Sequence, residues 1–312
     1  MMRTTEGHVV RALTIAGSDS GGGAGIQADL KTMHQFGVYG MSVITALTAQ
    51  NTTGVQGIFD VSPAFVRQQL ESVWSDIGVD AVKTGMLANS QIIDTVARFL
   101  REQGARNLVV DPVMIAKGGS PLLETEAVQS LRHELLPLGV VVTPNLPEAE
   151  VLCGFEIRST EDIHRACEDI AAMGPQTVVL KGGHTPLRWE RSDGVAPADA
   201  SPSGLAVDVV YSGGAFTYFA SERVRSEKTH GTGCTFSSAI TSMLAQGCTV
   251  LESIASAKAF IAGAISGAAD WDVGAGHGPT DHTAAVPVKF SPEAGRFYLY
   301  QGGKWSLLAS GH

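Results

Sequence analysis

Cysteines are few in this chain of 312 residues, and basic residues are outnumbered by acidic ones. The four cysteines are never in C-x-x-C spacing, which argues against a zinc site or a disulfide-stapled fold. With 22 basic and 31 acidic residues the net charge is −9, so nucleic-acid binding is not expected. We find neither a run of 18 apolar residues nor the apolar segment of a signal peptide, so we expect no membrane partner and a cytoplasmic protein.

The overall composition is that of a folded globular protein. Hydrophobic residues make up 44% and charged residues 17%, which is too apolar for a disordered chain. The one marked excess is glycine, with 36 residues, well above the average of about 7%. The glycines concentrate in short loops, and those loops carry most of the functional signal.

Short apolar runs alternate with amphipathic stretches along the chain. The runs show no polar alternation, which predicts strands buried on both faces of a sheet that helices cover. These strands are expected at residues 10–16, 81–84, 108–111, 140–143 and 178–180. Helices are expected at residues 26–36, 63–77, 91–102, 125–136, 236–244 and 250–268. The alternation predicts an α/β sandwich with a mostly parallel sheet.

Three later segments have a different character. Residues 206–226 predict two or three strands in series, a small antiparallel edge around Gly213-Gly214. Residues 186–204 contain three prolines and predict a surface loop. Residues 297–300 and 304–308 flank Gly302-Gly303 and predict a small hairpin in the tail.

The strongest chemical signal is the segment His230-Gly231-Thr232-Gly233-Cys234, which precedes a predicted helix. Two glycines let the backbone approach a ligand closely, and a helix start presents free N–H groups. Together they predict an anion site suited to phosphate. A thiol in the first helical turn is expected to have a lowered pKa and to act as a base. The alternative is an ordinary glycine-rich loop with a buried, inert cysteine.

A second glycine-rich loop runs from Gly17 to Gly25, between the first predicted strand and helix. It contains the spacing of a dinucleotide fingerprint, which is a weak signal on its own. The alternative is a loop over a small-molecule pocket, with Asp29 facing that pocket from the helix.

Charged residues follow several of the predicted strands. Asp111 and Glu148 lie at strand ends, where α/β sheets bind ligands, and two such acids could hold Mg²⁺. Taken singly, each acid could instead be a helix cap or a surface ion-pair partner. Lys181 follows another strand and could reach a nucleotide phosphate. Lys258, among Ala and Ile, is either a surface lysine or a second nucleotide contact.

In this order, the segments resemble the hydroxymethylpyrimidine/phosphomethylpyrimidine kinases of thiamine biosynthesis, in the ribokinase-like superfamily. The resemblance covers about residues 13–281. It is carried by residues 12–31, Thr48-Ala-Gln-Asn51, Lys83-Thr-Gly-Met86, Asp111-Pro-Val-Met114, Thr143-Pro-Asn-Leu-Pro-Glu148 and Thr229-His-Gly-Thr-Gly-Cys234.

The resemblance implies a kinase domain over residues 8–282, with a three-layer ribokinase-like sandwich, and a C-terminal extension over 283–312. It also implies ATP, Mg²⁺, a homodimer, and two successive phosphorylations of 4-amino-5-hydroxymethyl-2-methylpyrimidine. The residue roles that it implies are these: Cys234 as the base, with Gly231, Thr232 and Gly233 as the anion hole; Asp111 and Glu148 for the metal; Lys181, Lys258, Glu148 and Asn145 for the nucleotide; and Gly17, Asp29, Gln50, Met86 and Val113 for the pyrimidine. The Gln50 carboxamide can accept from the exocyclic amine of the pyrimidine and donate to its ring nitrogen.

Three other functions are compatible with parts of the pattern. A pyridoxal kinase on the same fold is the nearest alternative, although Gln50 favours an aminopyrimidine. A non-catalytic pyrimidine-binding relative would keep the pocket, but the joint presence of Cys234, Asp111, Glu148 and Lys181 argues against it. A dinucleotide-dependent oxidoreductase rests only on the first glycine loop.

Overall fold

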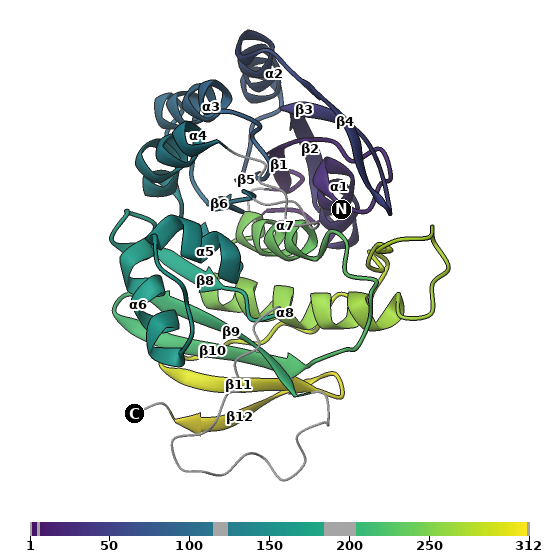
Figure 1. The fold of residues 1–312 in the computed structure, drawn as a ribbon, viewed down its shortest axis with the longest axis vertical. Coiled ribbons are helices and arrows are strands. Elements are labelled where there is room, and N and C mark those ends of the chain that lie inside the picture. Colours follow the sequence, from purple (N-terminus) through teal and green to yellow (C-terminus); the bar gives the residue numbers. More distant parts are fainter. Residues whose placement is uncertain (1, 5–6, 115–123, 184–203, 311–312) are drawn as a thin grey trace.

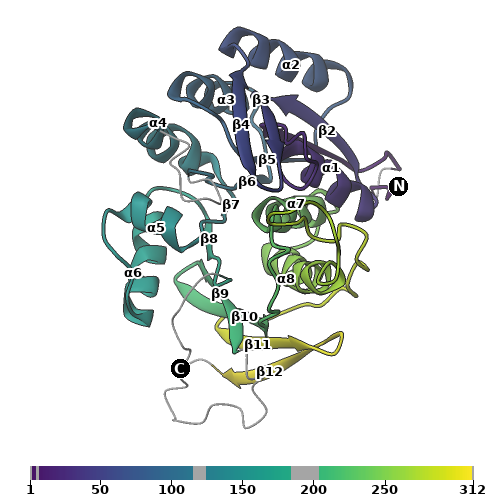
Figure 2. The same cartoon turned by 45° about the vertical axis from the view of Figure 1, so that its right-hand side comes forward.

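The computed structural model describes residues 2–4, 7–114, 124–183 and 204–310. One large sheet forms the middle layer, with ten strands in the order β12-β11-β10-β9-β8-β7-β6-β5-β1-β2. Helices cover both of its faces (Figures 1 and 2). The predicted three-layer α/β architecture is therefore confirmed.

The strands of the large sheet are β1 (Arg11–Ala16), β2 (Tyr39–Ile44), β5 (Ala81–Thr84), β6 (Leu108–Val110), β7 (Val141–Val142), β8 (Thr177–Leu180), β9 (Leu205–Ser212), β10 (Ala215–Glu222), β11 (Arg296–Gln301) and β12 (Lys304–Ser310). A separate two-stranded antiparallel sheet consists of β3 (Ala46–Asn51) and β4 (Gly54–Asp60). All five predicted core strands are present. The strands β2, β3 and β4 were not predicted.

The helices are α1 (Gly25–Gln35), α2 (Pro63–Asp76), α3 (Ser90–Glu102), α4 (Thr125–Ser130), α5 (Leu146–Cys153), α6 (Thr160–Ala171), α7 (Thr232–Ala245) and α8 (Val250–Gly267). A π-helical turn at Leu131–Leu135 and a 3-10 turn at Leu136–Leu138 continue α4. The Ser62 hydroxyl caps α2 by accepting from Phe65 N, and Pro63 occupies the first turn, as the sequence predicts. The helices α5 and α6 were not predicted.

Parallel pairing runs through the six strands from β2 to β8 in the sheet order. The strand β9 is antiparallel to both β8 and β10, which confirms the predicted antiparallel edge. Alternate residues of the central strands pack on opposite faces: Val110 and Val142 lie against α2–α6, whereas Val109 and Val141 lie against α1, α7 and α8. This two-sided burial is why those strands are apolar throughout.

The tail hairpin of β11 and β12 adds to the main sheet. The strand β11 pairs in parallel with β10, and Tyr298 stacks on Phe219 with ring centroids 5.8 Å apart. Most of the predicted loop at residues 186–204 lies outside the described residues.

The helix α8 is long and apolar enough to match the length and hydropathy of a membrane span. It packs against α7 and β10, and most of its residues are buried. In this structure it is a core helix of the sandwich.

Candidate functional site

Most of the predicted site residues follow the carboxyl ends of the parallel strands or lie where α7 begins. Asp111 follows β6, Asn145 and Glu148 follow β7, and Lys181 follows β8. A Cβ atom added at Gly233 in α7 would lie 3.3 Å from Lys181 Nζ and 3.6 Å from Asp111 Oδ2. The start of α7 therefore faces the charged strand ends directly.

The start of α7 is built for close contact between the two glycine loops. Gly231 is its N-cap, with φ +80°, and no side chain caps the helix. A Cβ atom at Gly231 would lie 1.8 Å from the carbonyl oxygen of Gly23, so only glycine fits there. The first intrahelical hydrogen bond runs from Thr235 N to Gly231 O. The amides of Gly233 and Cys234 precede it and are suited to an anion.

Cys234 lies in the first turn of α7, close to the charges of Lys83, Asp29 and Asp111. Burial raises the pKa of its thiol to about 11, although Lys83 and the backbone N–H of Gly25 act in the opposite direction. The prediction of a lowered pKa is therefore wrong, because desolvation of the thiolate outweighs the helix start and the nearby ammonium.

Asp29 is fully buried, near enough to Cys234 for its charge to act on the thiol, and forms an ion pair with Lys83. Lys83 Nζ donates to both carboxylate oxygens, at 2.8 and 2.9 Å. The hydroxyls of Thr14 and Ser238 donate at 2.6 and 2.7 Å. The charge of Asp29 holds the pKa of Lys83 above its usual range in spite of burial. Asp29 thus supports the floor of the site.

Lys83 was not among the predicted site residues. Its signal in the sequence is a lysine inside the otherwise uncharged strand Ala81-Val-Lys-Thr84, which is buried at every position. A buried lysine requires a partner, so its position already indicates a nearby carboxylate.

Asp111, Lys181 and Glu148 form a second charged group, in which the two acids are buried and the Lys181 side chain is 17% exposed. Lys181 Nζ lies 2.9 Å from Asp111 Oδ1 and 4.0 Å from Glu148 Oε2. Burial favours a higher pKa for Asp111, but the ammonium groups of Lys181 and Lys83 hold that pKa below its usual range. Burial raises the pKa of Glu148 to about 7. The charge of Asp111 also raises this pKa, whereas the ammonium group of Lys181 lowers it.

The donor set of this group suits Mg²⁺. Two carboxylates and the Thr143 hydroxyl, which donates to Asp111 at 3.2 Å, are hard oxygen groups. Among the described residues, no three His, Cys, Asp or Glu side chains gather as a complete metal cage. Mg²⁺ commonly uses one or two carboxylates and fills its remaining positions with phosphate and water. Asp111 and Glu148 therefore fit a metal held jointly with a nucleotide.

Lys258 and Asn145 have structural partners. Lys258 is buried and pairs with Asp208 at 3.1 Å, while the other Asp208 oxygen accepts from Gly182 N at 2.9 Å. Lys258 is thus not a surface lysine, and its role toward a nucleotide stays a prediction. The Asn145 side chain caps α5 by accepting from Glu148 N at 2.9 Å.

The predicted pyrimidine-pocket residues lie around the first glycine loop. Gly17 N donates to Met86 O at 3.1 Å, and a Cβ atom at Gly17 would lie 2.5 Å from Met86 Cε. Val113 N donates to Asp111 O at 2.8 Å. The backbone oxygen of Gln50 accepts from Ser20 Oγ in the loop, also at 2.8 Å.

Asp19 and His230 hold the two glycine loops together, and the sequence predicted neither this pair nor a role for either side chain. The Asp19 carboxylate accepts from the amides of Gly21, Gly23 and Ala24, at 2.8, 3.1 and 2.8 Å. His230 Nε2 lies 2.8 Å from Asp19 Oδ2. The two residues are 211 positions apart, so no local pattern joins them.

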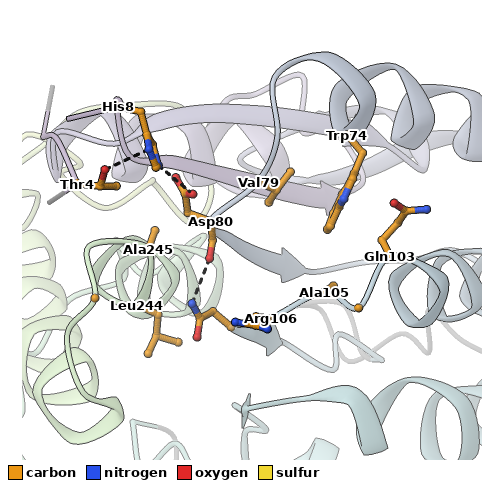
Figure 3. A pocket seen from close by; sticks show the side chains of 13 residues that line it. Thr4, His8, Trp74, Val79, Asp80, Gln103, Ala105, Arg106, Leu244 and Ala245 are labelled. Carbon is orange, nitrogen blue, oxygen red and sulfur yellow. Dashed lines mark hydrogen bonds and ion pairs between the residues drawn. The ribbon is translucent and has the colours of Figure 1, made fainter. Parts of the chain in front are cut away.

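A cavity of about 490 Å³ lies at the opposite, amino-terminal ends of β5 and β6 (Figure 3). Its polar centre is Asp80, which contacts Arg11 at 2.8 Å and His8 at 3.4 Å and whose carbonyl accepts from Asn107 at 3.1 Å. None of the predicted site residues lines it. These contacts join the first strand to the sheet, and the cavity is separate from the candidate site.

Comparison with known proteins agrees with the geometry. The family model described as phosphomethylpyrimidine kinase matches residues 19–281. A hydroxymethylpyrimidine/phosphomethylpyrimidine kinase of Bacillus subtilis is 44% identical over 276 residues, covering 88% of this chain and 96% of the relative. The thiamine biosynthesis bifunctional protein ThiED of Geobacter sulfurreducens is 50% identical over 88% of this chain, which spans 52% of that longer relative. The solved Bacillus subtilis pyridoxal kinase in complex with ADP has a TM-score of 0.78 and 42% identity, and covers 89% of this chain and 98% of its own.

Proposed function

Since the chain belongs to the phosphomethylpyrimidine kinase family, we propose that it transfers a phosphoryl group from ATP to 4-amino-5-hydroxymethyl-2-methylpyrimidine. A second transfer to the resulting monophosphate then gives the diphosphate for thiamine biosynthesis. The observation that carries this proposal is the position of Cys234. It lies on the uncapped first turn of α7, beside the buried charges of Lys83 and Asp111.

Each part of the site has a task in phosphoryl transfer. The amides of Gly233 and Cys234 stabilise the negative charge of the transferring group, whereas the amide of Thr232 already donates to the carbonyl of Thr229. Most of the rate comes from such positioning and neutralisation. Cys234, in its thiolate form, takes the proton of the substrate hydroxyl as the oxygen bonds to the transferred phosphorus and the bond to the departing ADP breaks. Gln50 recognises the aminopyrimidine edge by accepting from its amine and donating to its ring nitrogen.

Asp111 and Glu148 would hold Mg²⁺ together with the ATP phosphates. When bound, the ion neutralises charge on the phosphate oxygens. Lys181 lies 2.9 Å from Asp111 and holds the pKa of that carboxyl below its usual range, whereas its pull on Glu148 at 4.0 Å does not outweigh burial. Because the pKa of Glu148 is about 7, metal binding is expected to release its proton near neutral pH.

The test is direct. The purified protein is incubated with Mg-ATP and the hydroxymethyl aminopyrimidine, with pyridoxal in parallel and reactions without ATP as controls. We expect a mass increase of two phosphoryl groups on the pyrimidine. Phosphorylation of pyridoxal alone would overturn the proposal in favour of a pyridoxal kinase. The absence of both products would favour a non-catalytic binding protein.

Pyridoxal is a plausible side substrate because the solved pyridoxal kinase shares 42% of its residues with this chain. Gln50 favours the aminopyrimidine as the main substrate, since pyridoxal carries a ring hydroxyl in place of the amine. The first glycine loop packs on the second one through Gly23 and Gly231, so its glycines are explained without a dinucleotide.

We further propose a cytoplasmic homodimer, as the family resemblance implies, with neither nucleic acid nor membrane as a partner. The net charge of −9 supports the absence of nucleic-acid binding. The hairpin β3–β4 exposes large apolar side chains, including Phe59 at 70% exposure, and is a suitable contact surface for the second copy.

Lys258→Met tests whether this lysine contacts the nucleotide. We expect the free energy of unfolding to fall by about 3 kcal/mol, because Asp208 loses its buried partner. The KM for ATP should change by less than about 2-fold if Lys258 makes no contact with the bound nucleotide. Urea unfolding and initial rates measure both effects, with the exposed Lys304→Met as control. A roughly tenfold higher KM at unchanged stability would restore the nucleotide role.

A further inference from the structure

His230 contacts two parts of the site that are far apart in the sequence. Its Nε2 atom lies 2.8 Å from Asp19 Oδ2 in the first glycine loop and 3.4 Å from Nε2 of Gln50, so the structure has the NH₂ group of the carboxamide facing His230. It directly precedes Gly231, the N-cap of α7. The imidazole is largely buried, with 16% of the side chain exposed. One side chain thus links the loop before α7, the first glycine loop and the Gln50 carboxamide, which is proposed to bind the pyrimidine edge.

The contact with Asp19 determines what His230 can offer to Gln50. A carboxylate oxygen only accepts hydrogen bonds at neutral pH, and Asp19 stays ionised because hydrogen bonds from His230 and from backbone amides outweigh its burial. His230 Nε2 therefore carries a hydrogen and donates. An NH₂ group of Gln50 facing that nitrogen would place two hydrogen-bond donors against each other. The carboxamide oxygen of Gln50, in contrast, can accept from the His230 N–H together with Asp19.

Thr48 leads to the same orientation from the other side of the carboxamide. Its hydroxyl donates to the Ser18 carbonyl at 2.8 Å, which uses its single hydrogen. The same hydroxyl oxygen lies 3.1 Å from Oε1 of Gln50, which could accept only a hydrogen that the hydroxyl already gives to Ser18. It can now only accept there, so it calls for the NH₂ group of Gln50.

We propose that His230 is a positioning residue that sets substrate specificity by orienting the Gln50 carboxamide. The hydrogen-bond donors and acceptors around it favour a carboxamide turned by half a rotation from the orientation above, with its oxygen toward His230 and its NH₂ group toward Thr48. This inference rests on the proposed function, because it assigns Gln50 to the pyrimidine edge. One N–H and one oxygen lone pair of Gln50 remain for the substrate, at defined positions. A 4-aminopyrimidine presents the matching donor and acceptor.

The matching competitor is the 4-oxo analogue, in which the exocyclic amine is replaced by a carbonyl and the ring nitrogen carries a hydrogen. Its donor and acceptor positions are the reverse of those in the amino substrate. If the Gln50 carboxamide is fixed, its N–H faces the N–H of the analogue's ring and its oxygen faces the analogue's carbonyl oxygen. A site built on hydrogen bonds rejects such an analogue strongly. Once His230 is removed, the carboxamide can turn by half a rotation and pair with the oxo compound.

The experiment compares kcat/KM for the amino and oxo pyrimidines in the wild type, His230→Ala and His230→Gln. We expect His230→Ala to lower the amino-to-oxo ratio by about 10-fold or more, mainly through KM. His230→Gln keeps an N–H donor and should retain most of the discrimination. Any disturbance of the anion loop slows both substrates alike and cancels in the ratio. The exposed His133→Ala serves as the matched control.

Thr48→Val gives an independent second variant, which removes the other partner of Gln50 without touching His230. It should also lower the ratio. An unchanged ratio in both His230→Ala and Thr48→Val, with the wild type active on the amino substrate, would overturn the orienting role and leave the proposed function standing. A wild type inactive on the amino pyrimidine would overturn both proposals.

Discussion

A Cys234→Ala variant is expected to lose about 10²- to 10³-fold of kcat in the first transfer, within the range of a general base. The loss should be smaller in the second transfer, because the acceptor there is already an anionic phosphate and has little need of a base. Single-turnover assays of each step separate chemistry from product release. Equal losses in the two steps would contradict the base assignment.

The pH dependence sharpens this test. Because burial raises the pKa of Cys234 to about 11, the thiol is protonated near pH 7 and its thiolate fraction grows tenfold with each pH unit. The first-transfer rate of the wild type should therefore rise between about pH 7 and pH 9.5, with a slope of log kcat near one. That rise should be absent from Cys234→Ala.

Cys248→Ala is the matched control for these experiments. Cys248 follows the opposite end of α7, and burial likewise raises the pKa of its thiol. It should keep the activity and the pH profile of the wild type. A flat wild-type profile would indicate that Cys234 contributes by shape and polarity alone.

Replacing Lys83 by Met is expected to lower the free energy of unfolding by about 3–5 kcal/mol, the cost of leaving a buried charge without its partner. Both side chains of the pair with Asp29 are 0% exposed. The hydroxyls of Thr14 and Ser238 would remain as hydrogen-bond donors to Asp29, but they carry no compensating charge. The same change removes a positive charge beside Cys234, so the activity should fall as well.

Urea unfolding gives the measurement, and an unchanged m-value would show that only stability has changed. The additional change Asp29→Asn should recover part of the loss, because it removes the orphaned charge. The control is Arg158→Met, which breaks an exposed pair with Glu156 and should cost less than about 1 kcal/mol. A loss from Lys83→Met as small as that of the control would refute the buried-pair argument.

The stabilisation by Lys83 should be insensitive to pH over the ordinary range. Its pKa in the folded state is raised above the usual 10.5, so its contribution is fully present below that value. It is lost only as pH rises through the higher folded-state pKa. The difference in stability between the wild type and Lys83→Met is therefore expected to stay constant between pH 6 and pH 9.

The sequence by itself determined the central strands and most of the helices, and it indicated where the candidate site lies. Strands buried on both faces are apolar at every position, and helices show their period and their caps, as at Ser62-Pro63; these signals arise among residues near each other in the chain. Two glycine loops and acids at strand ends located the site. The strands β2 to β4 were not predicted from the sequence, because β2 and β3 mix exposed and buried residues and β4 is exposed throughout.

Only the tertiary structure decided how the site residues are paired and charged. Lys258 looked like a free cation until the fold placed Asp208, 50 positions earlier, against it. Cys234 was expected to be acidic, but the depth of its burial raises its pKa. The link between His230 and Asp19 spans 211 positions. Partners so distant leave no local pattern, and desolvation depends on every segment that packs around a group, so these properties follow only from the folded chain.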